Sequence, residues 1–311
     1  MELCFLGTSA GKPTLERNVS SIVFNLTEER GAYWLFDCGE GTQHQLMRAS
    51  FRLSRLENIF ITHLHGDHLF GLPGLMSSRS LLDGAHPLTV FGPPGLKRYV
   101  DTVLEISQAR IEYPWQVREI GEGIVFEDER FIVEAKKLDH RIDTFGYRIR
   151  EKDRPGKLLD DRLKAAGIAP GPIYGTIKKG IDVVLEDGTV LTAKEFTAPP
   201  IPGRVVAILG DTRYCRQSVE LARQADVVVH EATFDEDLGH LAHQYYHSTA
   251  EQAAALAREA EARALILTHF STRYRPDDVE RIVDKVRAMF PNTYAAEDFM
   301  RFPVDRHVLQ Q

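Results

Sequence analysis

Short runs of apolar, β-branched and aromatic residues recur along the chain, separated by segments rich in glycine, proline and polar residues. Runs of this length between turn signals are typical of buried or half-buried strands. They predict strands at residues 3–6, 21–26, 33–36, 58–61, 88–91, 131–136, 145–149, 205–209, 227–229 and 264–267.

Other segments repeat apolar residues at helical spacing. They predict helices at residues 96–107, 218–223, 249–261 and 276–289. Ser248, Thr249, Ala250 and Glu251 have the pattern of a capping box, which predicts that the third helix begins there. Alternating strands and helices indicate an α/β fold in which helices cover sheets.

The length and composition of the chain are typical of a globular protein. The chain has 311 residues, of which 43% are apolar and 27% charged, so it can bury a large core. No segment approaches the roughly 18 apolar residues needed to span a bilayer, and the first residues lack the pattern of a secretory signal. Cys4, Cys38 and Cys215 are scattered without metal-ligand spacing, which fits a reducing compartment. We therefore expect a cytoplasmic protein whose cysteines are small buried residues.

Charge is unevenly distributed. The net charge of −7 argues against a nucleic-acid partner, because binding phosphates requires Lys and Arg. From Arg148 to Gly180, however, nine basic residues stand against four acidic ones. The segment 151–198 is also rich in glycine and proline, and a strand pattern resumes only at Arg204. It is therefore expected to be an insertion that projects from the core, either as a solvated loop or as an RNA contact.

The most informative stretch is Thr-His-Leu-His-Gly-Asp-His at 62–68, directly after the apolar run 59–61. It places three imidazoles and one carboxylate at the end of a predicted strand, and these groups suit Zn²⁺. Four ligands from one loop exceed what one catalytic ion takes while keeping a position open, so the loop predicts two ions. The alternative is a His-rich surface turn.

Metal-binding residue types recur after other predicted strands. His140 follows the strand at 131–136, Asp211 follows 205–209, and His269 follows 264–267. Each alone is more typical of a surface or core residue. Because ligands gather outside the carboxyl ends of strands in α/β sheets, we expect these three residues to join the 63–68 loop.

Further motifs accompany this loop along nearly the whole chain. They lie at 5–10, 11–18, 36–43, 210–212, 230–233 (His-Glu-Ala-Thr), 247–249 (His-Ser-Thr), 268–269 and 271–274. Together they resemble the zinc-dependent ribonuclease Z family, in its short bacterial form, within the metallo-β-lactamase superfamily. The 63–68 loop alone identifies only the superfamily, whereas His-Glu-Ala-Thr, His-Ser-Thr and the basic insertion are typical of ribonuclease Z.

The resemblance implies a fold, an activity and an assembly. The fold would be a four-layer αβ/βα sandwich formed by one domain, 1–311, with 151–198 inserted as a flexible arm that grips the tRNA body. The activity would be endonucleolytic removal of the 3′ trailer from precursor tRNA, leaving a 3′-hydroxyl on the tRNA and a 5′-phosphate on the trailer. The family also implies a homodimer in which the arm of one subunit serves the site of the other.

The resemblance further implies two Zn²⁺ per subunit and a set of site residues. One ion would be held by His63, His65 and His140, the other by Asp67, His68 and His269, with Asp211 bridging them. Asp67 would also accept the proton of the attacking water, and His247, oriented by Glu231, would donate a proton to the leaving ribose oxygen. Alternatively, His247 is a hydrogen-bonded core residue and Ser248 a helix cap. Candidate phosphate contacts are Lys12, Arg17, Arg273, Lys178 and Lys179. Asp37 is either a support for ligand imidazoles or a turn residue.

The sequence departs from the family pattern at two places, and both leave open how the substrate is recognised. Thr14 and Leu15 stand where some relatives carry a further Lys, and Tyr245 and Tyr246 precede His247 where relatives are less aromatic. Rival functions are a di-iron oxidoreductase, a lactam or lactone hydrolase, a non-catalytic RNA-binding module and a small-molecule phosphodiesterase. His65 disfavours the first, since that branch tends to place Glu there. The last is the nearest competitor, because only the arm separates it from a tRNA nuclease.

Overall fold

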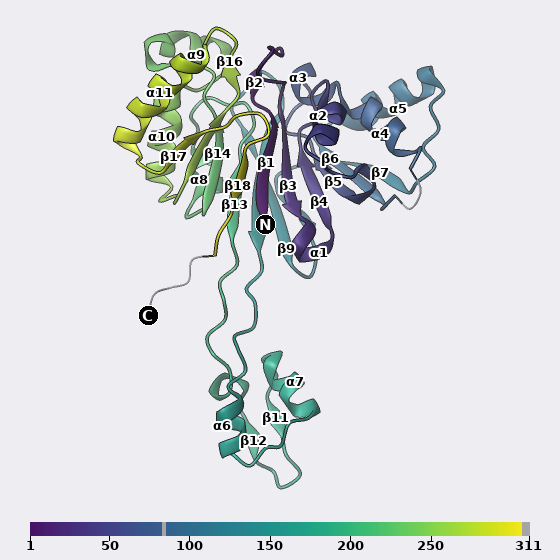
Figure 1. Cartoon of the computed structure of the whole chain (residues 1–311), viewed down its shortest axis with the longest axis vertical. Helices are drawn as coiled ribbons and strands as arrows, with labels where there is room; N and C mark the ends of the chain where they lie inside the picture. Colours follow the sequence, from purple (N-terminus) through teal and green to yellow (C-terminus); the bar gives the residue numbers. More distant parts are fainter. Residues whose placement is uncertain (83–84, 307–311) are drawn as a thin grey trace.

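Two seven-stranded sheets pack face to face at the centre of the fold (Figure 1), and the computed structural model describes residues 1–82 and 85–306. The first sheet has the order β18-β1-β3-β4-β5-β6-β7: β1 (Glu2–Gly7), β3 (Ser21–Leu26), β4 (Ala32–Phe36), β5 (Leu56–Phe60), β6 (Leu88–Gly92), β7 (Trp115–Glu119) and β18 (Arg301–Pro303). The second has the order β17-β15-β14-β13-β10-β9-β8: β8 (Gly123–Glu127), β9 (Phe131–Leu138), β10 (Thr144–Glu151), β13 (Val205–Ile208), β14 (Val227–Glu231), β15 (Leu265–Thr268) and β17 (Thr293–Ala295). In each sheet, one half is parallel and the other antiparallel.

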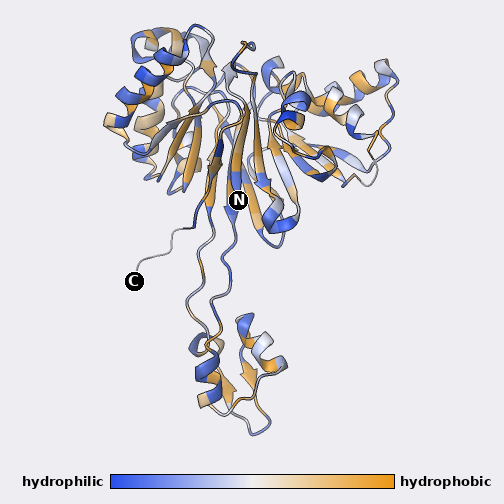
Figure 2. Ribbon diagram, in the orientation of Figure 1, coloured by the Kyte–Doolittle hydropathy of each residue, from blue (hydrophilic) through white to orange (hydrophobic). Residues whose placement is uncertain are grey.

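Apolar side chains fill the space between the sheets. Because successive side chains of a strand point to opposite faces, Leu3 and Phe5 of β1 join this central core, whereas Cys4 packs on the outer side. Trp34 of the first sheet meets Phe131 of the second, with ring centroids 5.3 Å apart. Figure 2 shows the same arrangement as hydrophobic colouring concentrated on the strands.

Helices cover the outer face of each sheet and complete four layers. The first sheet is covered by α2 (Thr42–Arg48), α4 (Leu72–Arg79) and α5 (Leu96–Ser107), and the second by α8 (Arg216–Ala222), α10 (Ala250–Glu259) and α11 (Pro276–Met289). This confirms the predicted four-layer α/β sandwich. No helix in the described residues is both long and apolar enough to cross a membrane.

Short elements complete the sandwich. They are α1 (Thr27–Arg30), α3 (Gly66–Leu69), α9 (Gly239–Tyr245), two 3₁₀ turns at Leu53–Arg55 and Glu236–Leu238, and the small parallel pair β2 (Ser9–Ala10) and β16 (Phe270–Ser271). A further 3₁₀ turn, Ala193–Glu195, belongs to the segment between β10 and β13. The β2–β16 pair joins the N-terminal loop of the first sheet to the segment that follows β15, so the two halves of the sandwich meet at this edge.

The predicted helix start at Ser248 is wrong by one residue. The N-cap is Thr249, whose side chain accepts from the backbone of Gln252, while the Gln252 side chain accepts from the backbone N–H of Thr249. Ser248 instead donates its hydroxyl to the carbonyl of Thr212 at 2.6 Å. The prediction failed because both residues can cap, and the tertiary bond to Thr212 decides between them. Among the cysteines, Cys4 and Cys38 are buried as expected, but Cys215 is only half-buried.

The segment between β10 and β13 projects away from the sandwich on two extended strands of chain (Figure 1). Its tip contains α6 (Asp160–Ala165), α7 (Pro172–Lys178) and the hairpin of β11 (Val183–Val184) and β12 (Val190–Leu191). The tip has a small core of its own, formed by Leu163, Ile177, Leu191, Ala193 and Phe196. We call the residues 151–198 the arm.

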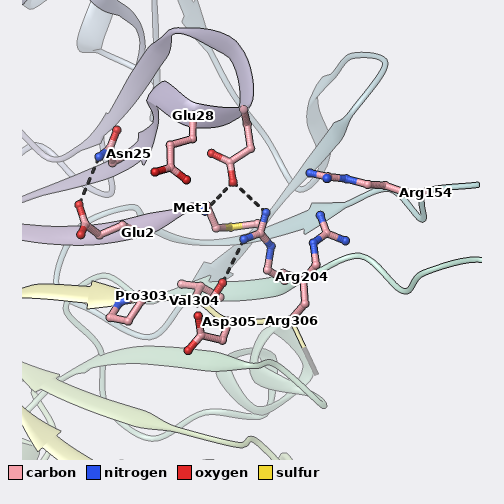
Figure 3. Close-up of a pocket in the computed structure, with 11 residues that line it drawn as sticks. Met1, Glu2, Asn25, Glu28, Arg154, Arg204, Pro303, Val304, Asp305 and Arg306 are labelled. Carbon is pink, nitrogen blue, oxygen red and sulfur yellow. Dashed lines mark hydrogen bonds and ion pairs between the residues drawn. The ribbon is translucent and has the colours of Figure 1, made fainter. Parts of the chain in front are cut away.

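A buried ion cluster fixes the root of the arm. Arg204 donates to Glu151 and to Glu29, each at 2.9 Å, and to the carbonyl of Val304 at 3.1 Å. Figure 3 shows Arg204 beside Arg154 and Arg306 at a cavity of about 370 Å³. Because Glu151 ends β10 and Arg204 precedes β13, this cluster ties the two ends of the arm to each other and to the sandwich.

Candidate metal centre

The side chains that the sequence predicts as metal ligands meet at one edge of the sandwich. They come from the loop after β5 and from the residues that follow β9, β13 and β15. Carboxyl ends of strands gather at one edge of α/β sheets, and this is why residues so distant in sequence converge. Within the loop, α3 turns His68 back towards His63, and their ring centroids lie 4.1 Å apart.

Four of these residues form a first group of donor atoms. Nε2 of His63 lies 3.0 Å from Nδ1 of His65, which lies 3.3 Å from Nε2 of His140. Oδ2 of Asp211 is 3.7 Å from Nε2 of His63. His63 is fully buried and Asp211 nearly so, whereas His65 and His140 are half-buried and face the opening.

The remaining three residues form a second group. Oδ2 of Asp67 is 3.5 Å from Nε2 of His68 and 3.4 Å from Nε2 of His269, and these two nitrogens are 3.3 Å apart. Asp211 contacts this group too, with Oδ1 3.5 Å from His68 and Oδ2 3.4 Å from His269. Asp211 therefore stands between the two groups, at the position a bridging carboxylate would occupy.

The spacing of the donor atoms fits two small cations. Ligands about 2.0–2.1 Å from a tetrahedral ion lie roughly 3.3–3.4 Å from one another, and the distances in both groups scatter around that value. Nε2 of His68 and Nε2 of His269 each carry a lone pair when Nδ1 of the same ring donates to Asp37 or to Thr233, so their 3.3 Å contact is not a hydrogen bond between neutral imidazoles. Imidazole nitrogen and carboxylate oxygen are the donor set that Zn²⁺ takes in catalytic sites.

The electrostatics of the groups point the same way. Burial lowers the pKa of His68, but the charges of Asp211, Asp37 and Asp67 outweigh it and hold that pKa well above its usual value. Burial raises the pKa of Asp211, yet the charges of His269 and His68 hold it well below the usual value. The carboxylates Asp37, Asp67 and Asp211 thus favour positive charge at the centre, from protons or from metal ions.

Hydrogen bonds behind the ligands fix their orientation. Nδ1 of His68 donates to Oδ2 of Asp37 at 2.7 Å, and Nδ1 of His140 donates to the carbonyl of Tyr246 at 2.8 Å. Such bonds leave Nε2 unprotonated and aimed at the centre. Asp37, which adopts a left-handed backbone conformation, also accepts from the N–H of Thr62 at 2.7 Å, so it is a support and not merely a turn residue.

Two threonines relay this support, one on each side of the centre. Nδ1 of His63 is 3.0 Å from the hydroxyl of Thr62, which donates to Asp37 at 2.9 Å. Nδ1 of His269 is 2.9 Å from the hydroxyl of Thr233, which lies 2.5 Å from Oε2 of Glu231. In each case, an imidazole donates to a hydroxyl and the hydroxyl donates to a buried carboxylate.

His247 lies beside the centre and is held by Glu231. Nδ1 of His247 is 2.9 Å from Oε1 of Glu231, whose carboxylate also accepts from the N–H of Thr212 at 2.8 Å. Burial lowers the pKa of His247, but the charges of Glu231 and Asp211 have the larger effect and raise that pKa to about 9. His247 also forms a group of possible metal donors with Asp211 and His269, and a carboxylate partner on Nδ1 is compatible with metal binding through Nε2. Its raised pKa favours the protonated ring, and this is what suits it to donate a proton.

An open cleft of about 310 Å³ leads to the centre. Five of the seven proposed ligands line it, and the rest of its wall includes Gly11, Arg141, Phe234, Tyr245 and His247. Gly11 donates its backbone N–H to Oδ2 of Asp67 at 2.8 Å, which anchors the 11–18 loop to the centre.

The candidate phosphate contacts lie in three different places. Arg273 is exposed, with its guanidinium over the ring of Phe234 at 5.0 Å, so it flanks the cleft. Lys12 is exposed on the loop next to Gly11. Lys178 and Lys179 are exposed on the arm. Arg17 is half-buried, and its Nη1 donates to Thr8 at 2.7 Å and to the carbonyl of Ala296 at 2.6 Å. These bonds tie it to the fold, and its contact with substrate stays a prediction.

Sequence reasoning missed several residues of the site. Thr62 immediately precedes the first ligand and Thr233 ends the His-Glu-Ala-Thr motif, and these positions were the available signal for the two relays. The carbonyl of Tyr246 and the N–H of Gly11 are backbone groups, which every sequence position offers equally. Arg141, which follows His140, also lines the cleft, and the sequence did not predict it as a site residue.

Sequence similarity to curated proteins identifies the family of this chain. Ribonuclease Z of Geobacillus kaustophilus is 56% identical over 306 residues, covering 98% of this chain and 100% of the relative. The chain belongs to the ribonuclease Z family. Ribonuclease Z of Anoxybacillus flavithermus is similar at 55% identity, with 98% of each chain covered.

Solved structures and family models agree with this assignment. The crystal structure of human tRNase Z, short form, is similar with a TM-score of 0.71 and 30% identity, covering 98% of this chain and 100% of the human chain. The model of the β-lactamase superfamily domain matches residues 195–270, and that of the anti-Pycsar protein Apyc1 matches residues 1–143. Membership in ribonuclease Z thus rests on relatives that span nearly the whole chain.

Proposed function

We propose that this chain is a zinc-dependent endoribonuclease that removes the 3′ trailer from precursor tRNA. The observation that carries the proposal is the pair of donor groups joined by Asp211, with the His247–Glu231 pair beside them in an open cleft. Two cations side by side are suited to phosphodiester hydrolysis, because they clamp the attacking and leaving oxygens of an in-line displacement. The names of the relatives, ribonuclease Z and tRNase Z, support RNA and specifically tRNA as the substrate.

The proposed cofactor is two Zn²⁺ per subunit, with the ligands divided as the two groups indicate. His63, His65 and His140 would hold one ion, Asp67, His68 and His269 the other, and Asp211 would bridge them. When bound, the ions supply positive charge that acidifies the attacking water and offsets charge on the phosphate oxygens.

Asp67 is the proposed proton acceptor for the attacking water. Its contacts to His68, His269 and Gly11 are made by Oδ2, which leaves Oδ1 to face the nucleophile. Burial raises the pKa of Asp67, but the charges and hydrogen bonds of His68 and His269 hold it far below its usual value. The group is therefore in the basic form at neutral pH.

His247 is the proposed proton donor to the leaving group. With a pKa raised to about 9, its imidazole carries a proton at neutral pH. As the water oxygen bonds to phosphorus, the bond from phosphorus to the ribose 3′ oxygen breaks, and that oxygen takes the proton from His247. The products are a 3′-hydroxyl on the tRNA and a 5′-phosphate on the trailer. Glu231 acts through His247 by orienting the ring and sustaining its protonation.

The proposed tRNA-binding role of the arm rests on a local groove. Residues 151–198 contain eight basic and eight acidic residues, so the excess of positive charge counted from Arg148 to Gly180 does not extend over the arm. Part of that excess belongs to β10, where Arg148 donates to the carbonyl of Leu221. A groove of about 630 Å³ on the arm, however, brings Arg154, Lys178, Lys179 and Lys194 together with only one acid, Asp153. Four clustered cations are the pattern that a phosphate backbone requires.

We propose further that the chain is one catalytic domain, 1–311, with 151–198 as an inserted arm, and that it acts in the cytoplasm as a homodimer. The support for the dimer is the position of the arm, which leaves the sandwich at the edge opposite α3, β2 and β16 (Figure 1). Residues of these three elements line the cleft, so the arm extends away from it, which favours service to a second subunit. Sedimentation at working concentration tests this, and a monomer that cleaves precursor tRNA at full rate would contradict it.

The decisive experiment incubates purified protein with precursor tRNA and maps the new ends. A matched variant joins Arg154 to Ile201 through a short Gly-Ser linker, because these residues already form a β-bridge at the base of the arm. We expect the full chain to cut at the 3′ end of the tRNA, and the armless variant to lose that cut while still hydrolysing bis(p-nitrophenyl) phosphate. The alternative function, a zinc phosphodiesterase for small diesters or other RNA, predicts that the armless variant and the full chain process every substrate equally.

A further inference from the structure

A tyrosine and an arginine form an exposed pair on the rim of the cleft. The guanidinium of Arg141 lies over the ring of Tyr245, 5.3 Å from its centroid. Both side chains line the cleft, and Tyr245 keeps 42% of its surface exposed. Neither forms a side-chain hydrogen bond or ion pair within residues 1–82 and 85–306, so packing and polar contacts do not account for the pair.

The pair is fixed to the metal centre through the backbone. Tyr245 ends α9 and Tyr246 adopts a left-handed conformation that turns the chain towards His247. The Tyr246 carbonyl accepts from Nδ1 of His140 at 2.8 Å. Since Tyr245 precedes Tyr246 and Arg141 follows His140, this bond holds the backbone of both members of the pair next to the proposed ligands.

The neighbouring aromatic residues differ from Tyr245 in exposure. Phe234 also lines the cleft beneath a guanidinium, that of Arg273, but it is 4% exposed. The ring of Tyr246 is half-buried under Arg213 at 4.1 Å. Tyr245 is thus the aromatic ring of the cleft wall that offers a free surface to a ligand. An aromatic ring supported by an arginine is a platform on which a nucleobase stacks, and it needs no hydrogen bonds to do so.

We propose that Tyr245, supported by Arg141, stacks on the base of the nucleotide whose ribose 3′ oxygen is released in the cut. This inference rests on the proposed function and adds a nucleotide-binding site to it. The choice of nucleotide follows from His247, the proposed donor to that oxygen, which lies two residues after Tyr245. The His247 ring is also 5.1 Å from that of His140, next to Arg141. The sugar that carries the leaving oxygen, and hence its base, therefore lies against this wall of the cleft.

The test is a double-mutant cycle between protein and substrate. Three precursor tRNAs are compared under single-turnover conditions: one intact, one abasic at the last nucleotide before the cut, and one abasic at the first nucleotide after it. The proteins are the wild type, Tyr245→Leu, Tyr245→Phe and the control Tyr214→Leu. Tyr214 is also 42% exposed, but its hydroxyl bonds to Glu259 outside the cleft. Metal content and Tm are measured for every variant.

With the wild type, we expect loss of the base before the cut to lower kcat/KM roughly 5- to 100-fold, the range of a single stacked base. Tyr245→Leu is expected to lower cleavage of intact substrate by a similar factor and to become insensitive to that abasic site. Tyr245→Phe keeps the ring and should restore both the rate and the sensitivity, and Tyr214→Leu should match the wild type.

Three results would overturn the proposal: wild-type kcat/KM in Tyr245→Leu, an undiminished abasic penalty in that variant, or coupling to the nucleotide after the cut. If Tyr245→Leu loses metal or folds poorly, Arg141→Met and the two abasic substrates with wild-type protein still test the site. A wild-type protein that cuts no precursor tRNA would instead contradict the proposed function, so the two failures are distinguishable.

Discussion

The carboxylate of Glu231 lies 2.9 Å from Nδ1 of His247, and it is 1% exposed. A buried carboxylate bonded to an imidazole favours the protonated ring, which explains why the pKa of His247 is raised to about 9 despite burial. This pair gives the centre a proton donor that is distinct from its proposed metal ligands.

His247→Ala is expected to lower the rate of precursor tRNA cleavage by about 100-fold or more, the usual scale for loss of a general acid. Metal content should stay at two ions per chain, because the two proposed donor groups do not include His247. Glu231→Gln should cause a smaller loss and move the alkaline limb of the pH–rate profile to lower pH, since the neutral amide no longer sustains protonation. Loss of metal from His247→Ala would show that this residue is a ligand.

Metal stoichiometry distinguishes the two donor groups. Asp211 contacts donors of both groups, with Oδ2 3.7 Å from His63 and 3.4 Å from His269. We expect His140→Ala to retain about one tightly bound ion and Asp211→Ala to retain less than one, as measured by mass spectrometry of dialysed protein. Chelation should abolish activity, and added Zn²⁺ should restore it. Equal ion content in the two variants would contradict a bridging role.

The threonine relays predict an effect on metal affinity without loss of a ligand. Thr62→Val and Thr233→Val remove the hydroxyls that connect His63 to Asp37 and His269 to Glu231. Each should weaken binding of one ion by about 10- to 100-fold, as is typical when the partner of a ligand imidazole is removed. Serine at either position keeps the hydroxyl and is the matched control. Competition with a fluorescent chelator measures the affinity, and unchanged affinity in both valine variants would exclude the relay.

The parts of the fold that the sequence predicted have strong local patterns. The helix at Pro276–Met289 begins and ends as predicted, because apolar residues at helical spacing decide its buried face. β7 was missed because Gln116 and Arg118 interrupt its apolar residues. β8 was missed although Ile124, Val125 and Phe126 form a short apolar run, because polar and glycine residues flank that run closely. α4 was missed because Pro73 and Gly74 interrupt its pattern, although Pro suits the first turn of a helix.

In the candidate site too, some residues could be predicted from local sequence patterns and others could not. His63, His65, Asp67 and His68 could be predicted as ligands because they lie together in the sequence. His140, Asp211 and His269 could be predicted because each follows a strand. Among the supports, Asp37 was a candidate from the sequence, whereas the carbonyl of Tyr246 was not, since a backbone carbonyl has no signature in the sequence. The charge of the arm was misjudged because a window from Arg148 includes residues of β10 and stops before the acidic residues of the hairpin.

The groove of the arm predicts a salt-dependent effect on substrate affinity. Lys178, Lys179 and Lys194 line it, and reversing one of these charges should reduce tRNA affinity and flatten the dependence of log K on log salt by about one phosphate contact. Hydrolysis of bis(p-nitrophenyl) phosphate reports on the chemistry alone. Lys97→Glu, on α5 of the sandwich, is the matched control. An unchanged salt slope in all three groove variants would exclude the groove as the tRNA contact.

The ion cluster at the root of the arm predicts a pH-dependent stability. Burial raises the pKa of Glu151, but hydrogen bonds and charge from Arg204, with Arg154 and Arg306, lower it from 4.5 to about 2. A carboxyl whose folded pKa is depressed stabilises the fold above its unfolded pKa and loses that contribution as pH falls through the folded pKa. The contribution of Glu151 should therefore be complete at pH 7 and should decline between about pH 4.5 and pH 2.

Glu151→Gln tests this in metal-free protein, so that release of bound metal at low pH does not contribute to unfolding. At pH 7, the variant should be less stable by about 3 kcal/mol, because it leaves the buried Arg204 short of a partner. This difference from the wild type should shrink steadily as the pH falls below 4.5, as followed by urea unfolding. Glu127→Gln is the control, since Glu127 pairs with Lys152 at 2.7 Å with 48% of its side chain exposed and should cost less than about 1 kcal/mol at any pH. A difference for Glu151→Gln that stays constant from pH 7 to pH 3 would show that Glu151 contributes through packing and not through its charge.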